Sequence, residues 1–513
     1  MNLSVLIEMI EAQVSAAAFV RQALTILLLT VYGYVLVSAL CSAWSFRRRI
    51  LFSYPAGLSA FSIIAFLLVI LKIPYGTATV VVAALAVLFV LLVTLFFTAY
   101  QKDLRRFSIL WECRLIEALV AIVLVDFSIL LSCSGLLKVA ISNDSMFNYT
   151  FYPDMIVHYG GLRSNFNTFL TDVGPGSAMI GTLPFLFGFQ EMFGLQHMLN
   201  LDFLAIFYVA LYEKCNIGKK WIKVAVPLLG VALLSFTTPY LLISKWILAN
   251  DYFAVYMFFC VHLAEAGSTE SATDEEKSAA LNLLYLFLAV LSLLRIEGGV
   301  YVILFVILSS VRKISRRQLV CGMLLPAMFL QTLYAFRIFV TMEIIAPYRF
   351  LTEEKVLLMF AAMVLALVYL LLIRDRFLTG MQKHFGLWIL VGLLGINLLL
   401  CIREPTAYLE NMNAFVRNIL HEGGWGIFPA TVAVLYLLSV NKAFRFHFYD
   451  LMAFAYFFYA LAVSFMREGG LQTGPGDSGN RVLLQAVPLL LFAALIHIIK
   501  ALSGGGEIAE EKK

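Results

Sequence analysis

The chain has 513 residues, of which 62% are hydrophobic and only 13% are charged, and its mean hydropathy is +0.91. Soluble domains carry about 25% charged residues, so a soluble fold could not bury this much apolar surface. The net charge of +5 comes from basic residues in short loops between apolar runs, a pattern that reports membrane orientation and does not indicate a nucleic-acid partner.

Apolar runs predict the membrane helices, because crossing a bilayer core takes roughly 20 apolar residues per helix. In chain order we expect helices near residues 22–43, 51–71, 77–99, 115–138, 193–213, 221–242, 252–264, 279–294, 300–311, 319–340, 355–373, 386–402, 426–441, 449–465 and 482–500. The fold class is therefore an all-α, polytopic transmembrane bundle of about 13–15 helices without a soluble domain.

Basic loops set the expected orientation. The positive-inside rule predicts that residues 47–49, 102–106, 214–223, 312–317 and 374–383 are cytoplasmic, with the N-terminus outside and the C-terminus inside. We divide the chain into a lead-in with three helices (1–114), a membrane domain (115–500) and a disordered cytoplasmic tail (501–513). The outer loops then include 139–192, 403–425 and 466–481.

The span 279–311 allows two topologies. Two helices of about 16 and 12 residues rise only about 24 and 18 Å, so neither crosses a bilayer comfortably. If the acidic stretch 265–277 lies inside together with the basic loop 312–317, residues 295–299 form an outward-facing hairpin tip sunk below the surface. The alternative is one long kinked helix.

Asp144 follows the predicted helix 115–138, where apolar residues give way to a polar and aromatic stretch. A charge at the edge of a membrane span costs free energy unless it is paired or hydrated, so it is a functional candidate. It could act as a general base on an acceptor hydroxyl. The alternative is a turn or capping role, because Asn-Asp-Ser is common in turns.

Asp154 and His158 form an i, i+4 pair if the chain is helical from Tyr152 onward. The carboxylate could then orient the imidazole in a proton relay or a metal site, and a local salt bridge is the alternative. No HExxH, CxxC or other multi-ligand spacing supports a metal, so we predict none.

Two arginines are candidate phosphate ligands, since the planar guanidinium suits a phosphate. Arg295 lies with Glu297 in the expected hairpin tip, and an internal pair is the alternative. Arg481 ends the glycine-rich segment 474–481, which contains Asp477 and which we expect to be a flexible outer loop; anchoring at the interface is its alternative role. Asp251 is expected to cap the helix that follows it.

Together, several segments resemble the GT-C superfamily of integral-membrane glycosyltransferases, which includes protein O-mannosyltransferases and the aminoarabinose transferase of lipid A. The similar segments are Asp144 to Tyr149 in the first large outer loop, Gly174 to Gly188, the helix from Leu195, Thr238-Pro-Tyr followed by Asn250-Asp251, Leu294-Arg-Ile-Glu-Gly298 and Asn480-Arg-Val-Leu-Leu-Gln-Ala-Val-Pro-Leu. The resemblance covers residues 115–500.

The chain also departs from the pattern. Three additional helices precede the Asp-bearing loop, and Arg295 stands where the family commonly has Lys. Val482 and Gln485 replace a Tyr and a Pro, and the chain has no soluble domain for the acceptor, which leaves the acceptor the least defined part of the assignment.

The resemblance implies transfer of a sugar from a polyprenyl-phosphate carrier to a hydroxyl of a glycan, lipid or protein, on the extracytoplasmic face and with inversion. Asp144, Asp154 and His158 would be catalytic, whereas Arg481, Arg295 and Glu297 would bind the donor phosphate. Tyr149, Tyr152, Asp251 and Asp477 complete the expected site, and no cofactor is required. The sugar and the acceptor are not identified by the sequence.

Two other functions compete with this one. A transporter or flippase would use the same arginines to hold a polyanionic substrate, but transporters usually show internal repeats, and the chain shows none. A polysaccharide polymerase or ligase would use Arg403, Arg417 and His421 in the late outer loop. Two glycosylation sequons at Asn143 and Asn148, within the expected site, favour a bacterial plasma membrane, because glycans there would block it.

Overall fold

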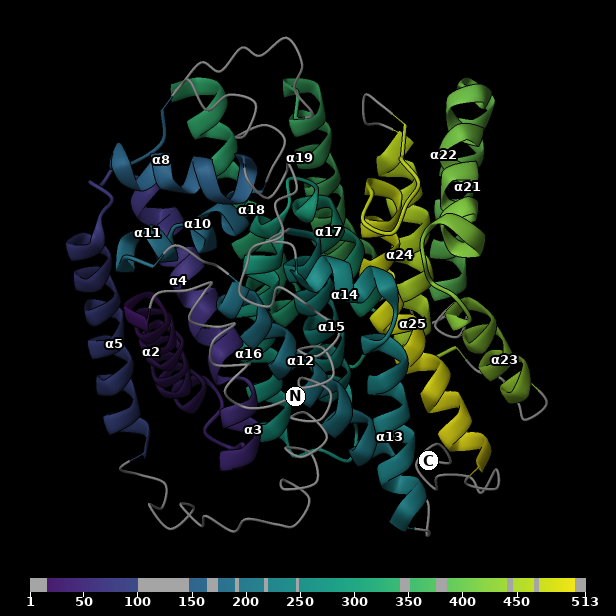
Figure 1. Ribbon diagram of the computed structural model, residues 1–513, viewed down its shortest axis with the longest axis horizontal. Coiled ribbons are helices and arrows are strands. Elements are labelled where there is room, and N and C mark those ends of the chain that lie inside the picture. Colours follow the sequence, from purple (N-terminus) through teal and green to yellow (C-terminus); the bar gives the residue numbers. More distant parts are fainter. Residues whose placement is uncertain are drawn as a thin grey trace. The chain divides into compact units, whose positions relative to one another are not determined.

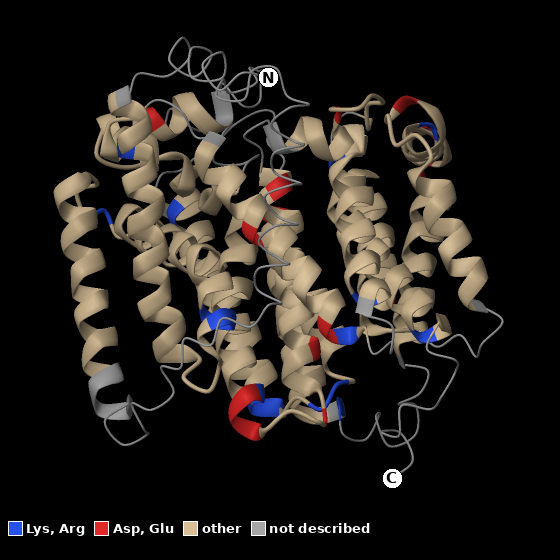
Figure 2. Cartoon of the chain, turned by 60° about the horizontal axis from the view of Figure 1, so that its bottom comes forward, with Lys and Arg blue, Asp and Glu red and all other residues tan. Residues whose placement is uncertain are grey.

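The computed structural model describes residues 16–99, 147–163, 174–189, 193–215, 220–245, 249–341, 351–374, 385–440, 446–465 and 470–502. In these ranges, helices are the only regular secondary structure. Within these ranges, ten helices are long and apolar enough to cross a membrane. Figure 2 shows the helix shafts largely free of charged residues. The predicted all-α, polytopic fold class is confirmed.

The elements follow the chain in this order (Figure 1): α2 Ala16–Leu40, α3 Phe46–Leu51, α4 Ser53–Ile70, α5 Thr77–Ala99, η2 Phe147–Phe151, α8 Tyr152–His158, α10 Pro175–Gly181, α11 Leu183–Phe187, α12 Phe193–Lys214, α13 Lys220–Ser235, α14 Thr238–Lys245, α15 Ala249–Ser268, α16 Asp274–Leu294, α17 Gly298–Ser309, η4 Gln318–Leu324, α18 Leu325–Ala335, η5 Phe336–Thr341, α19 Glu353–Val368, η6 Tyr369–Ile373, α21 Phe385–Arg403, α22 Pro405–Arg417, η7 Asn418–Glu422, α23 Phe428–Val440, α24 Phe448–Phe465 and α25 Ser478–Leu502.

Three predictions about elements need correction. The expected helix 221–242 is two helices, α13 and α14. The expected outer loops 139–192 and 403–425 both contain helices, namely η2, α8, α10 and α11 in the first and α22 with η7 in the second. The predicted helix 115–138, the boundary at residue 114 and residues 503–513 of the tail lie outside the described residues.

The chain divides into two compact units. Unit 1 comprises residues 1–109, 135–202 and 244–386, and unit 2 comprises 110–134, 203–243 and 387–513. Each predicted site residue therefore belongs to one unit or the other, and each unit is described by itself.

Backbone contact between α2 and α4 is the tightest packing in unit 1. A Cβ atom on Gly33 would lie 1.8 Å from the Ser53 carbonyl oxygen, and one on Gly57 would lie 1.9 Å from the Leu29 carbonyl oxygen. Small residues allow membrane helices to approach this closely. The sequence therefore needs glycine at both positions for α2 to pack on α4.

One end of unit 1 is defined by contacts between loops. The Cys41 thiol donates to the Ala279 carbonyl over 3.1 Å, and ion pairs join Glu265 to Arg312 and Glu270 to Lys313. The start of α16, the loop before it and the loop after α17 therefore lie at the same end of unit 1. The acidic stretch 265–277 and the basic loop 312–317 thus lie at the same end, which was the condition for a hairpin between α16 and α17.

Helices α16 and α17 form the predicted hairpin and not one kinked helix. The Gln331 side-chain amide donates to the Ser292 carbonyl in α16, and a Cβ on Gly299 in α17 would lie 3.2 Å from Gln331 Cγ. Both helices thus meet α18 at the same level, and Arg312 returns to Glu265. The tip is buried: Arg295 is only 8% exposed and Ile296 only 4%.

Unit 2 is built around α25. Phe492 contacts Phe207 of α12 and Tyr449 of α24, with ring centroids 5.2 and 4.5 Å apart. A Cβ on Gly230 of α13 would lie 2.5 Å from Leu495 Cδ1. The C-terminal half of α12 and the helices α13, α23 and α24 therefore surround the last helix.

We expect Gly57→Ala to lower the free energy of unfolding by about 1–3 kcal/mol, because the new methyl group overlaps the α2 backbone. Thermal unfolding of the purified protein in detergent measures this. Gly392→Ala in α21 is the control, since nothing lies within 4 Å of its Cβ position and alanine favours a helix. An equal loss in both variants would contradict the proposed contact.

Candidate functional site

The predicted site residues are split between the units. Tyr149, Tyr152, Asp154, His158, Asp251, Arg295 and Glu297 lie in unit 1, whereas Asp477 and Arg481 lie in unit 2. Asp144, the predicted base, lies outside the described residues.

Residues 152–158 form the helix α8, so the condition for the i, i+4 pair is met, and Asp154 and His158 lie one turn apart on it. Both side chains are exposed, and among the described residues no hydrogen bond or ion pair joins them. The His158 ring instead lies edge-on to Tyr159, with centroids 5.2 Å apart. The salt bridge considered for this pair is therefore not observed.

Helix α10 connects α8 with the hairpin tip in unit 1. A Cβ on Gly174 would lie 2.2 Å from the Leu294 carbonyl oxygen and 2.4 Å from the Arg295 nitrogen. Its φ of −68° suits any residue, so the close approach explains the glycine. At the other end of α10, a Cβ on Gly181 would lie 2.7 Å from Pro153 Cγ and 3.1 Å from the Tyr149 carbonyl oxygen.

Figure 1 shows the consequence of this packing: α8, α10 and α11 gather at one end of α4. The Ser62 hydroxyl of α4 donates to the Gly176 carbonyl over 3.1 Å, which fixes the depth of α10. Three segments that are distant in sequence, 149–158, 174–181 and 294–297, thus contact one another directly or through α10.

Arg295 forms the internal pair considered as one of its two roles. Its Nε donates to Glu297 Oε1 over 2.6 Å, and a terminal nitrogen of the same guanidinium pairs with the same oxygen. The two side chains are 9% and 12% exposed. The carboxylate therefore orients the guanidinium, whose fork carries further N–H donors.

Asp251 connects two helices instead of capping one. It is the third residue of α15 and only 1% exposed. Its Oδ2 accepts hydrogen bonds from Gln196 Nε2 and Asn200 Nδ2 of α12, both over 2.8 Å. The predicted cap is replaced by a link between helices, because the side chain faces α12.

In unit 2, buried asparagines form hydrogen bonds with the segment 470–477 of the expected outer loop 466–481, and residues 478–481 of that loop belong to α25. Asn411 Oδ1 accepts from the Leu471 amide over 2.7 Å. Asn418 accepts from the Gly474 amide over 2.9 Å and donates to the Gln472 carbonyl over 3.1 Å. A side-chain amide can both donate and accept a hydrogen bond. The two asparagines therefore bind N–H and C=O groups of this segment and hold its backbone in place.

Asn480 completes this network at the start of α25. Its Nδ2 donates to the Pro475 and Gly423 carbonyls over 2.8 and 2.7 Å, and its Oδ1 accepts from Trp425 Nε1. The side chain is fully buried. The loop 470–477 is therefore joined to η7 and to the turn before α23.

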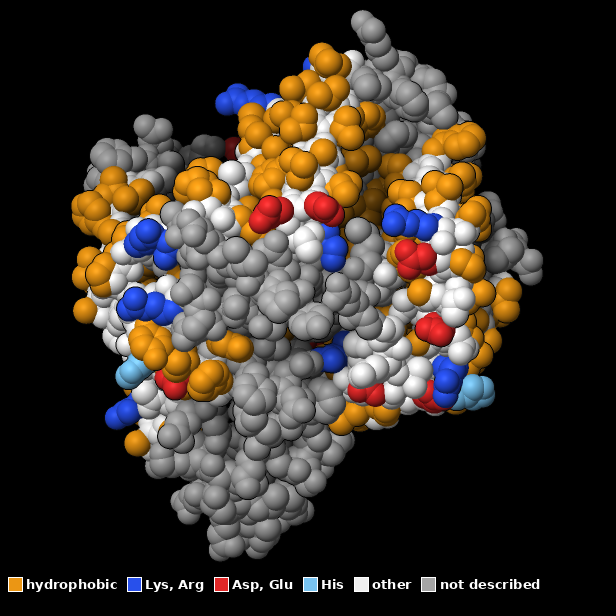
Figure 3. All heavy atoms as spheres, turned by 90° about the horizontal axis from the view of Figure 1, so that it is seen from above, with side chains coloured by type: hydrophobic (Ala, Val, Ile, Leu, Met, Phe, Trp, Pro, Cys, Tyr) orange, Lys and Arg blue, Asp and Glu red, His pale blue; other side chains and the backbone are white. Residues whose placement is uncertain are grey.

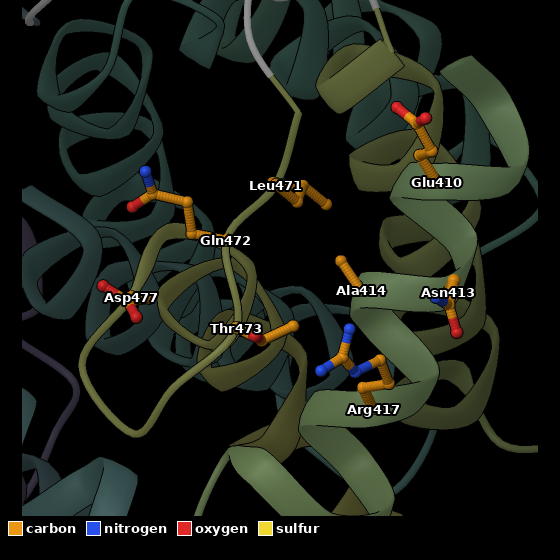
Figure 4. Close-up of a pocket in the computed structure, with 8 residues that line it drawn as sticks. All are labelled: Glu410, Asn413, Ala414, Arg417, Leu471, Gln472, Thr473 and Asp477. Atoms are coloured by element: carbon orange, nitrogen blue, oxygen red, sulfur yellow. The ribbon is translucent and has the colours of Figure 1, made fainter. Parts of the chain in front are cut away.

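A cleft of about 480 Å³ lies between this loop and α22. In Figure 4, Leu471 and Thr473 face α22 across the cleft, and Arg417 extends toward the loop. The lining residues are Glu410, Asn413, Ala414, Arg417, Leu471, Gln472, Thr473 and Asp477. The cleft is mixed in charge, as is the described end surface of the molecule seen in Figure 3.

Glu422 joins the two sides of the cleft. A hydrogen bond from Thr473 and one from Arg417 lower the pKa of the Glu422 carboxyl, and Arg417 Nε lies 2.9 Å from Glu422 Oε1. The Glu422 carboxylate therefore partly neutralises the positive charge of the Arg417 guanidinium.

Arg481 occupies the first turn of α25 and is half-buried, and its backbone N–H donates to the Asp477 carbonyl over 2.9 Å. The N-terminus of a helix favours anions, because unpaired N–H groups point outward there. The Asp477 carboxylate turns toward Gly474, where a Cβ would meet it at 2.4 Å.

Two acidic residues within apolar helices were not predicted. Asp450 in unit 2 is fully buried and accepts from the Tyr436 hydroxyl over 2.6 Å and the His447 amide over 2.7 Å, with His497 Nε2 at 2.9 Å. Asp202 lies inside the apolar helix α12. The available signal was a lone acid within a hydrophobic run, which marks a functional or structural site in a membrane helix.

No protein-family model, curated protein or solved structure matches this chain. Among the described residues, no group of His, Cys, Asp and Glu side chains is arranged to hold a metal by itself.

We expect Asn418→Asp to lower the free energy of unfolding by about 1–3 kcal/mol, since the Gln472 carbonyl loses its donor and a charge is buried. Amide hydrogen exchange of the peptide spanning 470–477 should accelerate. Asn413→Asp is the matched control, because that side chain is exposed on the preceding helix α22. Unchanged exchange in Asn418→Asp would show that the asparagine does not hold the loop.

Proposed function

We propose that this chain is a membrane glycosyltransferase that moves a sugar from a polyprenyl-phosphate carrier to an acceptor hydroxyl. The observation that supports it best is the packing of α10 between the hairpin tip and α8. Three of the segments that resemble GT-C enzymes thereby gather at one end of unit 1. Asp144 precedes η2 by three residues in the sequence, and η2 contacts α10.

In the proposed reaction, the acceptor oxygen attacks the anomeric carbon from the face opposite the phosphate. The bond between the anomeric carbon and the phosphate oxygen breaks, its electron pair stays with the phosphate, and Asp144 takes the hydroxyl proton. Asp154 and His158 could carry that proton to solvent, since both are exposed. The product is inverted, and the reaction needs no nucleotide.

Charge grows on the departing phosphate, so preorganised donors aimed at it accelerate the step. Arg295 meets this requirement because Glu297 fixes its orientation within a buried tip. Because Glu297 offsets the charge of Arg295, Arg295 contributes an oriented hydrogen-bond donor and little net positive charge. Arg481 lies in unit 2, in the first turn of α25, and we propose it as a further phosphate ligand because of the resemblance and because a helix N-terminus favours an anion.

A polysaccharide polymerase or ligase is the second candidate, and the cleft in unit 2 favours it. Arg417, predicted for that function, lines the cleft with Glu410 and Asp477. In that case the essential residues would lie on α22, and Asp144 would be dispensable.

We expect Asp144→Asn to keep the fold and reduce turnover by about 10²–10⁴-fold, because the amide cannot accept the proton. The assay supplies purified protein with polyprenyl-phosphate sugar and follows transfer by mass spectrometry. Sugar nucleotides serve as the control donors and should not be consumed. Full activity in Asp144→Asn, or direct use of sugar nucleotides, would exclude the mechanism.

Arg481→Ala should raise the KM for the lipid-linked donor and lower kcat, since the leaving phosphate loses a cation. Arg417→Ala is the comparison, and we expect it to leave donor KM unchanged. The reverse result, with Arg417 essential and Arg481 neutral, would favour the polymerase or ligase function over the proposed one.

A further inference from the structure

Two arginines of unit 1 lie at the ends of two neighbouring membrane spans. Arg317 directly precedes η4, which begins one apolar span, and Arg374 directly follows η6, which ends another. Arg374 Nη2 donates to the Ile314 carbonyl over 2.7 Å, and Arg374 Nε donates to the Ser310 carbonyl over 3.2 Å. The end of the second span is therefore bonded to the loop that leads into the first.

Other contacts confirm that these two helix ends are adjacent. The Tyr369 hydroxyl of η6 lies 3.1 Å from the Ser310 hydroxyl, and η4 packs against α19, the helix that η6 continues. Because Arg317 follows Ile314 by three residues, their Cα atoms are at most about 11 Å apart. Arg317 and Arg374 therefore lie at the same end of unit 1, at the same level of the two spans.

The acidic residues at this end do not offset the charge of these arginines. Glu265 and Glu270 reach the loop 310–317, and each is paired with a cation of the loop itself. Within the described part of the chain, no carboxylate pairs with Arg317 or Arg374. Carbonyl oxygens orient the Arg374 guanidinium but leave its charge, and buried charges in proteins are normally paired. An anion is therefore favoured at this position.

The Arg374 side chain is prepared to bind that anion. It is only 9% exposed, so its geometry is fixed by its surroundings. A guanidinium carries five N–H groups, and the two carbonyls use one on Nε and one on Nη2. No described residue bonds Nη1, and the planar fork suits the paired oxygens of a phosphate. Arg317 is exposed and supplies a second cation beside it.

Apolar surface on both spans continues from these arginines. Each span has large apolar side chains exposed at intervals of four or seven residues, which places them on one face of the helix. These are Leu325, Phe329 and Phe336 on the span that η4 begins, and Leu358, Leu365 and Leu372 on the span that η6 ends. Such faces contact lipid chains in a membrane protein, so the two arginines lie where lipid headgroups begin.

We propose that Arg317 and Arg374 bind the phosphate of an anionic phospholipid whose acyl chains lie along the exposed faces of these two spans. The positive-inside rule predicts that the loop 312–317 is cytoplasmic, and basic sites between helices on that side suit anionic headgroups. This site is separate from the proposed transfer reaction, and its test does not use that activity.

The test is the thermal unfolding of the full-length protein in detergent micelles that contain increasing amounts of palmitoyl-oleoyl phosphatidylglycerol. Phosphatidylcholine with the same acyl chains is the comparison, because it carries the phosphate but no net charge. A bound lipid stabilises the folded state by mass action, so phosphatidylglycerol should raise the midpoint saturably, by about 2 °C. Equal rises with both lipids would overturn the proposal. An equal rise with glycerol 3-phosphate alone would show that a free phosphate binds, and would also overturn it.

Variants locate the site. Arg317→Gln removes an exposed charge and should raise the phosphatidylglycerol concentration needed for half of the rise several-fold, and Arg374→Gln should have at least as large an effect. Arg163→Gln is the matched control, because that side chain is exposed after α8 and the change in net charge is the same. It should respond as the wild type does. If Arg374→Gln does not fold, Arg317→Gln and the two lipid titrations still decide. A wild-type response in folded Arg317→Gln would place the lipid elsewhere and refute the assignment.

Discussion

The absence of water inside a bilayer is the constraint on which this structure depends, because every buried polar group must then be satisfied by the protein. The hairpin tip of unit 1 places backbone groups and charged side chains inside the protein, where they need partners. The ion pair between Arg295 and Glu297, the donation from Gln331 to the Ser292 carbonyl and the close packing of Gly174 together make such a tip possible. The proposed chemistry uses the same polar groups.

Composition and charge were enough to predict the fold class and most long helices, because hydropathy over about 20 residues is a strong signal. The hairpin was one of two topologies open from the charges alone, and the ion pair between Glu265 and Arg312 decides it. Short helices such as α10 and α22 were assigned to loops, since they are too short or too polar to resemble membrane spans.

The site was less accessible to sequence reasoning than the fold. Spacing predicted that Asp154 and His158 share a helix face, but not that both side chains are exposed without an ion pair between them. The pairing of Arg295 with Glu297 was foreseen as one of two roles, whereas the asparagines that hold 470–477 were not. Such contacts depend on tertiary packing between distant helices, and no local pattern encodes them.

The glycine contact between α2 and α4 bears on how the N-terminal segment should be regarded. These helices looked like an appendage to the catalytic region, yet α4 holds Gly176 through Ser62 and α2 holds Gly188 through Arg21. Helices α2 and α4 therefore support α10 and α11, which shape the candidate site. A tag, fusion or truncation that disturbs α2 would therefore also disturb α10 and α11.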